Sequence, residues 1–224
     1  MQIVIPMSGF GERFRQAGYA VPKPLIEVDG KPIIQYIVEM FSDKDDFIFI
    51  CNEDHLNNKT YEMKSILRSI CSSCAIVGIP SHKLGPVYAV MQSIDFINLN
   101  SPVIVNYCDF TCDWDYSDFS NMVGETECDG AIPCYRGFHP HTLWSNYYAY
   151  VQEEKMYAYN IQEKQPFTDK PREEFASSGT YYFKSGALMQ RYFNRCIDEE
   201  LMVGGEYYVS MVYKPMMQDN LNIQ

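Results

Sequence analysis

Residues 1–24, MQIVIPMSGFGERFRQAGYAVPKP, decide the fold of this chain. Residues 2–6 form a short apolar run without the alternation of an exposed strand, which predicts a buried strand. The run leads into residues 8–13, where two glycines let the backbone turn tightly and bring its N–H groups close to an anion. Arg13 and Lys23 add fixed positive charge beside that loop. A strand, an anion-binding loop and two cations together predict a nucleoside triphosphate site.

Two better-known phosphate loops are excluded by the residues present. The dinucleotide fingerprint G-x-G-x-x-G needs a third glycine after Gly9 and Gly11, and Phe14 stands in that position. The Walker loop needs G-K-[ST], and the only Gly-Lys pair, at 30–31, precedes Pro32. Because a G-x-G pair alone is a weak signal, a glycine-rich turn with solvated charges is the alternative for this loop taken by itself.

Composition limits the partners that the chain can bind. Its 224 residues suffice for one domain with a full core. The net charge of −11 argues against nucleic acid and anionic membranes, because both need a basic face, but not against a nucleotide, which needs only local cations and a metal. No apolar run approaches the roughly 20 residues of a membrane span, and Met1 leads directly into the first strand. We therefore expect a cytoplasmic protein without a signal peptide.

The cysteines and histidines give little support for a structural metal. Several of the eight cysteines lie in apolar, strand-like runs, which predicts buried, reduced thiols. Cys71 and Cys74 have the spacing of half a zinc or redox site, but no second half follows. His139 and His141 are two residues apart without an evident third ligand, and we interpret them as part of a loop facing the acceptor.

The first half of the chain alternates between strand and helix patterns. We expect strands at 2–6, 46–51, 74–79 and 102–106, and helices at 31–41, 58–70 and 85–95. This alternation predicts an α/β fold with a Rossmann-like, mostly parallel sheet flanked by helices. Ligands of such sheets bind beyond the carboxyl ends of the strands, where both Gly9 and Asp109 fall.

The second half is richer in short strands. We expect them at 130–135, 147–152, 156–161 and 178–183, with a hairpin through 153–155, and helices at 185–196 and 206–217. These elements predict a small mixed lobe that binds the acceptor. With no repeat or linker in the sequence, a single domain over residues 1–224 is the simplest organisation.

Residues 7–14 and 21–34, MSGFGERF and VPKPLIEVDGKPII, resemble the signature of the sugar-phosphate nucleotidylyltransferases. That signature is a strand, A-A-G-x-G-x-R-[LFM], P-K-[PA]-L and then G-K-P-[ML]-[IL]. Residues 7–9 replace Ala-Ala-Gly. The positions in register are Gly11, Arg13, Phe14, Pro22, Lys23, Pro24, Leu25, Gly30, Lys31 and Pro32. The resemblance implies attack of an acceptor phosphate on the α-phosphorus of an NTP, with release of pyrophosphate and with Mg²⁺ as cofactor.

The resemblance also implies the nucleotide site. Arg13 and Lys23 would hold the triphosphate, and residues 85–89 match the family's G-T-A-x-A segment except at Pro86. The implied nucleotide contacts are Met7, Ser8, Gly9, Phe10, Gly11, Glu12, Gly85 and Ala89.

Asp109 is the implied metal ligand. It ends a buried strand, as the aspartate of the family's G-D does, with Cys108 in place of the glycine. A carboxylate there can hold Mg²⁺ against the α-phosphate. The alternative is a cap or turn aspartate, which is our interpretation of Asp113 and Asp115.

Three further residues are implied on the acceptor side. Lys164 lies in a segment like the family's E-K-P and would bind the acceptor phosphate, although lysines are usually just solvated. Gly179 would let the backbone approach the acceptor. Glu206 would bind acceptor or metal, or would be a first-turn acid favoured by the helix dipole.

One family feature is missing from this sequence. Relatives continue into a W-x-D-T-G-T-like segment with a second metal-binding aspartate, whereas residues 220–224 follow here. We expect a piece of a longer polypeptide, with an absent second metal or a substitute carboxylate as the alternatives.

The sequence thus predicts a Mg²⁺-dependent nucleotidyltransferase that supplies surface-polysaccharide precursors. Its partners would be an NTP and a small phosphorylated acceptor, with neither nucleic acid nor membrane, and a homo-oligomer is open. The small bacterial members that it resembles include cytidylyltransferases, so CTP is favoured over UTP and dTTP. The alternatives are a non-catalytic nucleotide-sugar-binding regulator and a glycosyltransferase, for which residues 113–115 would be the D-x-D motif.

Overall fold

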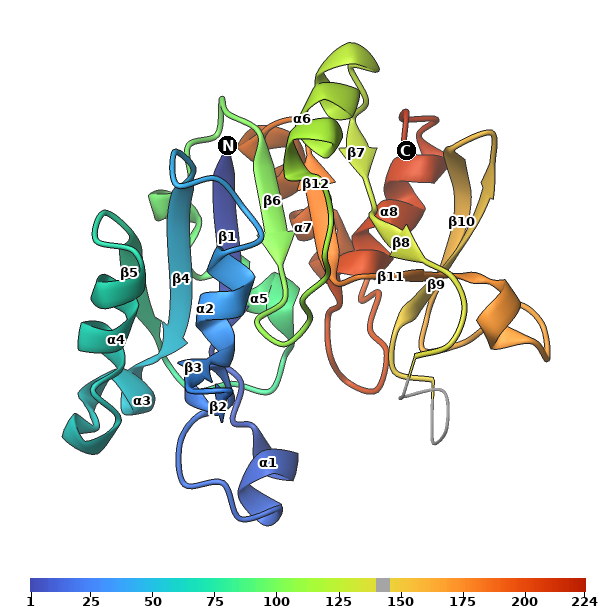
Figure 1. Ribbon diagram of the computed structural model, residues 1–224. Coiled ribbons are helices and arrows are strands. Elements are labelled where there is room, and N and C mark those ends of the chain that lie inside the picture. Colours follow the sequence, from blue (N-terminus) through green and yellow to red (C-terminus); the bar gives the residue numbers. More distant parts are fainter. Residues whose placement is uncertain (140–145) are drawn as a thin grey trace.

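The computed structural model describes residues 1–139 and 146–224, with a six-stranded sheet at its centre (Figure 1). This sheet contains, in spatial order, β5 (Ala75–Ile79), β4 (Asp46–Asn52), β1 (Gln2–Met7), β6 (Val103–Asn106), β12 (Thr180–Phe183) and β7 (Gly130–Ala131). A second sheet contains β10 (Tyr157–Glu163), β9 (Ala149–Glu154), β11 (Phe175–Ser177) and β8 (Cys134–Tyr135). The short strands β2 (Glu27–Val28) and β3 (Lys31–Pro32) pair separately.

The order of the central strands creates a site at one edge of the sheet. β5, β4, β1 and β6 are parallel, whereas β12 and β7 join antiparallel. The chain moves from β1 outward through β4 to β5 and then returns to place β6 on the other side of β1. In an open parallel sheet such a reversal leaves a crevice beyond the carboxyl ends of the two strands. The expected mostly parallel α/β fold is confirmed.

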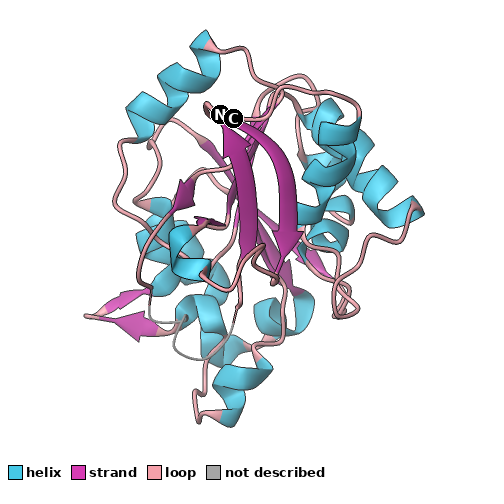
Figure 2. Cartoon of the chain, turned by 90° about the vertical axis from the view of Figure 1, so that its right-hand side faces the viewer, coloured by secondary structure: helices cyan, strands magenta, loops and turns pink. Residues whose placement is uncertain are grey.

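Helices cover both faces of the central sheet (Figure 2). They are α1 (Glu12–Gln16), α2 (Ile33–Val38), α3 (Glu53–Asn57), α4 (Met63–Ile70), α5 (Pro86–Met91), α6 (Tyr116–Glu125), α7 (Gly186–Asp198) and α8 (Val209–Gln218). Side chains of β1 alternate between two cores: Val4 packs with α5, α7 and α8, whereas Ile3 and Ile5 pack with α2, α4 and α6. None of the helices in the described parts of the chain is long and apolar enough to cross a membrane.

Several elements differ from the expected ones for local reasons. The helix expected at 31–41 begins only at Ile33, because Pro32 is extended (ψ 144°) and pairs in β3. The helix expected at 58–70 is interrupted at Glu62, which has a left-handed backbone (φ 47°), so α4 begins at Met63. The strand expected at 130–135 divides into β7 and β8, which belong to different sheets. The elements β2, β11, α1, α3 and α6 were not expected.

The small sheet forms the lobe expected in the second half. Its hairpin turns at Lys155 and Met156, which both have positive φ (53° and 71°), the backbone of a two-residue turn. The lobe packs against α8 through its strand β10. The position of α8 therefore fixes how the lobe sits against the central sheet.

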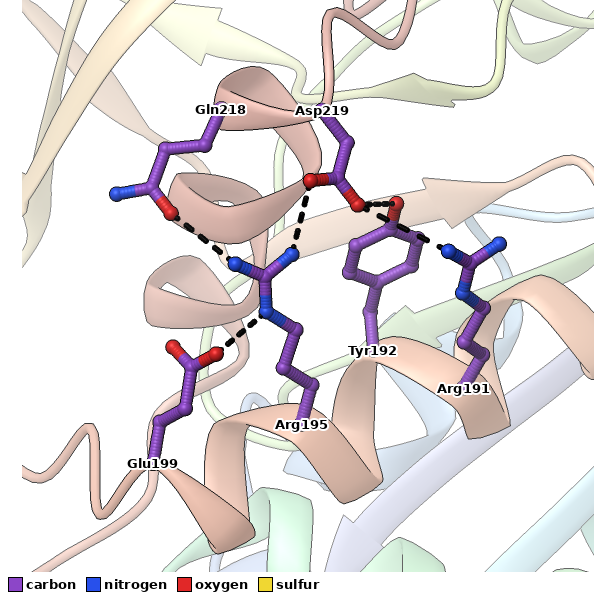
Figure 3. Close-up of polar contacts among 6 residues, drawn as sticks. All are labelled: Arg191, Tyr192, Arg195, Glu199, Gln218 and Asp219. Carbon is purple, nitrogen blue, oxygen red and sulfur yellow. Dashed lines mark hydrogen bonds and ion pairs between the residues drawn. The ribbon is translucent and has the colours of Figure 1, made fainter.

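A polar cluster fastens the carboxyl end of α8 to α7 (Figure 3). The Asp219 carboxylate accepts hydrogen bonds from Tyr192 Oη (2.6 Å) and Arg195 Nη1 (3.0 Å) and lies 3.9 Å from Arg191 Nη2. Arg195 also donates to Glu199 Oε1 (2.6 Å) and Gln218 Oε1 (3.3 Å). These donors lower the pKa of Asp219.

We expect Asp219→Asn to lower the thermal unfolding temperature, because it removes the charge that the cluster surrounds. A lowered pKa stabilises the fold above the ordinary value of 3.8, and that contribution is lost as the pH falls below it. The difference in unfolding temperature between wild type and variant should therefore shrink in acid. A difference in unfolding temperature that is the same at pH 7 and pH 3 would contradict this account. The control is Glu173→Gln, a substitution of an exposed carboxylate.

Candidate active site

A first cavity of about 550 Å³ lies beyond the carboxyl ends of β1 and β6. Its lining contains every nucleotide contact expected from the sequence: Met7, Ser8, Gly9, Phe10, Gly11, Glu12, Gly85 and Ala89. Arg13, Lys23 and Asp109 also line it. The structure thus brings segments as far apart in the sequence as residues 6–14 and 204–208 to one cleft.

The loop after β1 is built by two glycines with different roles. Gly11 has a left-handed backbone (φ 61°) and begins the single turn of α1, so a side chain would be strained there. Gly9 has open space around it, with nothing within 4 Å of a Cβ placed on it, and so exposes its backbone to the cavity. Glu12 points back to Lys83, with 2.7 Å between carboxylate and ammonium, which lowers the pKa of Glu12.

Lys23 and Asp109 form an ion pair across the cleft. Lys23 comes from the short turn after Pro22, and Asp109 follows β6. The Lys23 ammonium also lies 5.0 Å from the centre of the Phe14 ring. The side chains keep 20% and 40% of their exposure, so both remain accessible to a ligand.

The residues present fit a Mg²⁺ site that the substrate completes. Within the described ranges no group of three or more His, Cys, Asp or Glu side chains could hold a metal alone. Mg²⁺ in nucleotide sites is usually held by one or two carboxylates together with substrate phosphates, and Asp109 is placed to be such a ligand. Cys71 and Cys74 are free thiols, as expected. Of the suggested histidine pair, His141 lies outside the described residues.

A second cavity of about 720 Å³ adjoins the first and contains Lys164 and Gly179. The two cavities share the lining residues Arg13, Phe14, Lys23, Tyr107, Asp109 and Tyr208. The cations expected to bind triphosphate therefore lie where the cavities meet. An anion in each cavity could approach the other at this junction.

Tyr208 links the two cavities. Its hydroxyl donates to Glu206 Oε2 and accepts a hydrogen bond from the Lys164 ammonium. Glu206 lines the first cavity rather than the second, so the structure places it away from the side on which acceptor binding was expected. Its alternative assignment as a first-turn acid is wrong, since α8 begins only at Val209.

Glu163 lies buried beside Lys164, with 7% of its surface exposed. Its Oε2 accepts a hydrogen bond from Ser210 Oγ at 2.6 Å. Burial raises the pKa of Glu163 to about 7, against the opposing effects of Ser210 and Lys164. A carboxyl that changes charge near neutral pH thus forms part of the second cavity.

Gly85 lets two distant backbones touch behind the first cavity. Tyr207 N–H donates to Leu84 O (2.9 Å), and Val87 N–H donates to Tyr207 O (3.1 Å). A Cβ on Gly85 would lie 2.8 Å from Tyr207 N and O, and its φ of 87° is unfavourable for other residues. Pro86 occupies the first turn of α5, where its missing N–H is harmless. The glycine of this segment is therefore required by packing, whatever it also does for a ligand.

Sequence reasoning missed several residues of these cavities: His82, Lys83, Tyr107, Glu163 and Tyr208. Glu163 precedes Lys164 in the segment that was recognised, so its position was a usable signal. Tyr107 and Tyr208 lie within two residues of the candidates Asp109 and Glu206, whereas His82 and Lys83 became visible only when the fold brought their segment to the cleft.

Comparison with known proteins identifies the class. The family model described as nucleotidyl transferase matches residues 3–207, so the chain belongs to the nucleotidyl transferase family. Among curated protein sequences, none matches it.

Solved structures share its fold at low identity. A nucleoside-diphosphate-sugar pyrophosphorylase from Vibrio cholerae RC9 has 20% identity and a TM-score of 0.74, over 100% of this chain and 90% of that one. A UDP-glucose pyrophosphorylase bound to UDP-glucose has 18% identity and a TM-score of 0.73, over 98% and 88%. The inositol-1-phosphate CTP transferase from T. maritima has 13% identity and a TM-score of 0.74, over 100% and 83%.

We expect Gly85→Ala to destabilise the fold by about 2–4 kcal/mol, because it combines an unfavourable backbone with a clash against the Tyr207 backbone. Gly9→Ala is the matched control: it has free space, so its unfolding free energy should stay within about 0.5 kcal/mol of wild type. Urea unfolding measures both. Equal stability of the two variants would show that the backbone contact is dispensable.

We expect the stability of wild type relative to Glu163→Gln to fall as the pH rises. A raised pKa stabilises the fold fully below the ordinary value of 4.5, and this contribution is lost as the pH rises through about 7. The change amounts to about 3 kcal/mol between pH 4.5 and pH 8. Urea unfolding at several pH values measures it, with the exposed Glu173→Gln as control. Parallel pH profiles for wild type and Glu163→Gln would rule out a buried carboxyl that titrates near neutrality.

Proposed function

We propose that this protein transfers a nucleoside monophosphate from an NTP to a small phosphorylated acceptor and releases pyrophosphate. The observation that supports this most is the Lys23–Asp109 pair at the junction of the two cavities. One cavity is lined by the glycine loop and the other by Lys164, so two phosphorylated substrates can meet beside the pair. Membership of the nucleotidyl transferase family fits this chemistry.

The protein's task in such a reaction is alignment and charge neutralisation. Arg13 and Lys23 would bind triphosphate oxygens, and Lys164 would hold the acceptor phosphate. If Lys23 bound a phosphate oxygen in place of Asp109, the Asp109 carboxylate would be free to hold Mg²⁺. Mg²⁺, when bound there, would neutralise charge that develops on the phosphates. The aromatic side chains of Phe14, Tyr107 and Tyr208 line the junction and would limit the access of water.

The substrates proposed are CTP, with UTP and dTTP next, and a sugar phosphate or another phosphate monoester. Among the neighbours, one is a CTP transferase and another is a UDP-glucose pyrophosphorylase bound to UDP-glucose, so the fold accommodates both bases. Supply of surface-polysaccharide precursors is the role that we propose for the product, in the cytoplasm.

The glycosyltransferase alternative has less structural support. Asp115 caps α6 by accepting the N–H of Asp118 at 3.0 Å, as a helix-cap aspartate does. Asp113 lines a separate apolar cavity and neither of the two described above. The two aspartates of the D-x-D triplet are therefore not brought together with the glycine loop.

The test is pyrophosphate release with Mg²⁺ for CTP, UTP, dTTP, GTP and ATP, each against sugar-1-phosphates, alditol phosphates and phosphocholine. We expect release with one pair, and we expect Lys23→Ala to lower its kcat by about 10²–10³, the effect of losing one preorganised charged group. Lys31→Ala is the control, because that lysine pairs with Glu39 outside both cavities.

Two results would contradict the proposal. Near-normal turnover of Lys23→Ala would remove this lysine from the reaction. Binding of an NTP without pyrophosphate release from any pair would favour the non-catalytic regulator.

A further inference from the structure

A hydrogen-bond chain of fixed direction runs into the first cavity through His82. The backbone N–H of Leu84 donates to His82 Nδ1 at 3.2 Å, so Nδ1 must carry a lone pair and the proton must lie on Nε2. His82 Nε2 lies 3.3 Å from Ser8 Oγ. The Nε2–H therefore donates to the serine oxygen. Burial lowers the pKa of His82, which keeps the ring neutral as this arrangement requires.

The Ser8 hydroxyl is left with its own proton to donate. Its oxygen accepts from His82, and among the described residues no acceptor for the Ser8 O–H is found. Ser8 is 4% exposed and lines the first cavity, so its hydroxyl is removed from bulk water but can reach a ligand. A buried hydroxyl without an acceptor is unfavourable, and a ligand atom that accepts its proton would relieve this.

The position of this hydrogen-bond chain within the first cavity indicates which part of a bound nucleotide it would contact. Arg13 and Lys23 line the junction with the second cavity, whereas Ser8, His82 and Ala89 line the first cavity alone. Phosphates belong beside Arg13 and Lys23, because these cations line the junction that the acceptor must also approach. The nucleoside then extends into the part of the first cavity that the second does not share, where Ser8 lies.

We propose that the His82–Ser8 chain reads the nucleoside by donating a hydrogen bond from the Ser8 hydroxyl to an acceptor atom of the base or ribose. This inference rests on the proposed function, because it requires a nucleotide in the first cavity. His82 is a positioning residue: it fixes Ser8 as a donor. A serine without this partner could rotate and serve as donor or acceptor alike.

The test compares the dissociation constants of the best NTP, its 2′-deoxy analogue and inorganic tripolyphosphate by calorimetry. We expect Ser8→Ala to weaken NTP binding about 5–30-fold, the effect of deleting a buried hydrogen bond, and to change tripolyphosphate binding less than twofold. The centre of the His82 ring lies 4.9 Å from that of Tyr88. His82→Phe keeps an aromatic ring in this position but removes both ring nitrogens. It should weaken NTP binding less than Ser8→Ala does, again without affecting tripolyphosphate. Ser81→Ala is the control, since its hydroxyl bonds Asn52 and Asp54 outside the cavity.

The analogue identifies the acceptor atom. If Ser8 donates to the ribose 2′-oxygen, Ser8→Ala will not further weaken binding of the 2′-deoxy analogue; if it donates to another atom, the loss will be equal for both nucleotides. Wild-type affinity of either variant for the NTP, or an equal loss for tripolyphosphate, would overturn the inference while the proposed function stands. Failure of the wild type to bind any NTP would overturn both.

Discussion

The site depends on one backbone contact between the two halves of the chain. Leu84 and Val87 exchange hydrogen bonds with Tyr207 only because Gly85 has no side chain. This contact delivers Glu206 and Tyr208 to the cleft, and α8 begins directly after it. From α8, Ser210 reaches Glu163, and the N–H of Val209 donates to the Tyr107 hydroxyl at 3.2 Å. The walls of both cavities thus follow from a contact that involves no catalytic side chain.

Local charge, and not net charge, suits this acidic protein for anionic substrates. Lys23, Lys83 and Lys164 each have an internal partner in the cleft: Asp109, Glu12 and Tyr208. Such accessible pairs contribute little to stability, because water and salt screen them. A phosphate offers stronger, charge-assisted hydrogen bonds, so a substrate can replace these partners at little loss. The pairs keep the cations oriented until that exchange occurs.

The sequence predicted those parts of the structure that neighbouring residues determine. The apolar run of β1 and the glycines behind it specify a buried strand and a loop, and the alternation of later segments specifies the parallel sheet. Prediction failed where distant residues decide the outcome. Residues 206–208 have a helical pattern, but Tyr207 forms backbone hydrogen bonds with Leu84 and Val87 instead, and α8 begins only at Val209. Within its own segment His82 accepts a hydrogen bond from Leu84 and lies beside the Tyr88 ring, whereas Ser8 lies 74 residues away, so no local pattern pointed to the His82–Ser8 pair.

The shared lining of the two cavities suggests why their linkage matters for the proposed reaction. A phosphoryl acceptor and a triphosphate repel each other, so their meeting point needs positive charge that both can use. Arg13 and Lys23 line both cavities at that point, and Asp109 can add a cation to it. The Tyr208 hydroxyl connects Lys164 in one cavity to Glu206 in the other. A ligand that displaced Lys164 from Tyr208 would therefore also change the hydrogen bonding of Glu206, so a single side chain connects the two cavities physically.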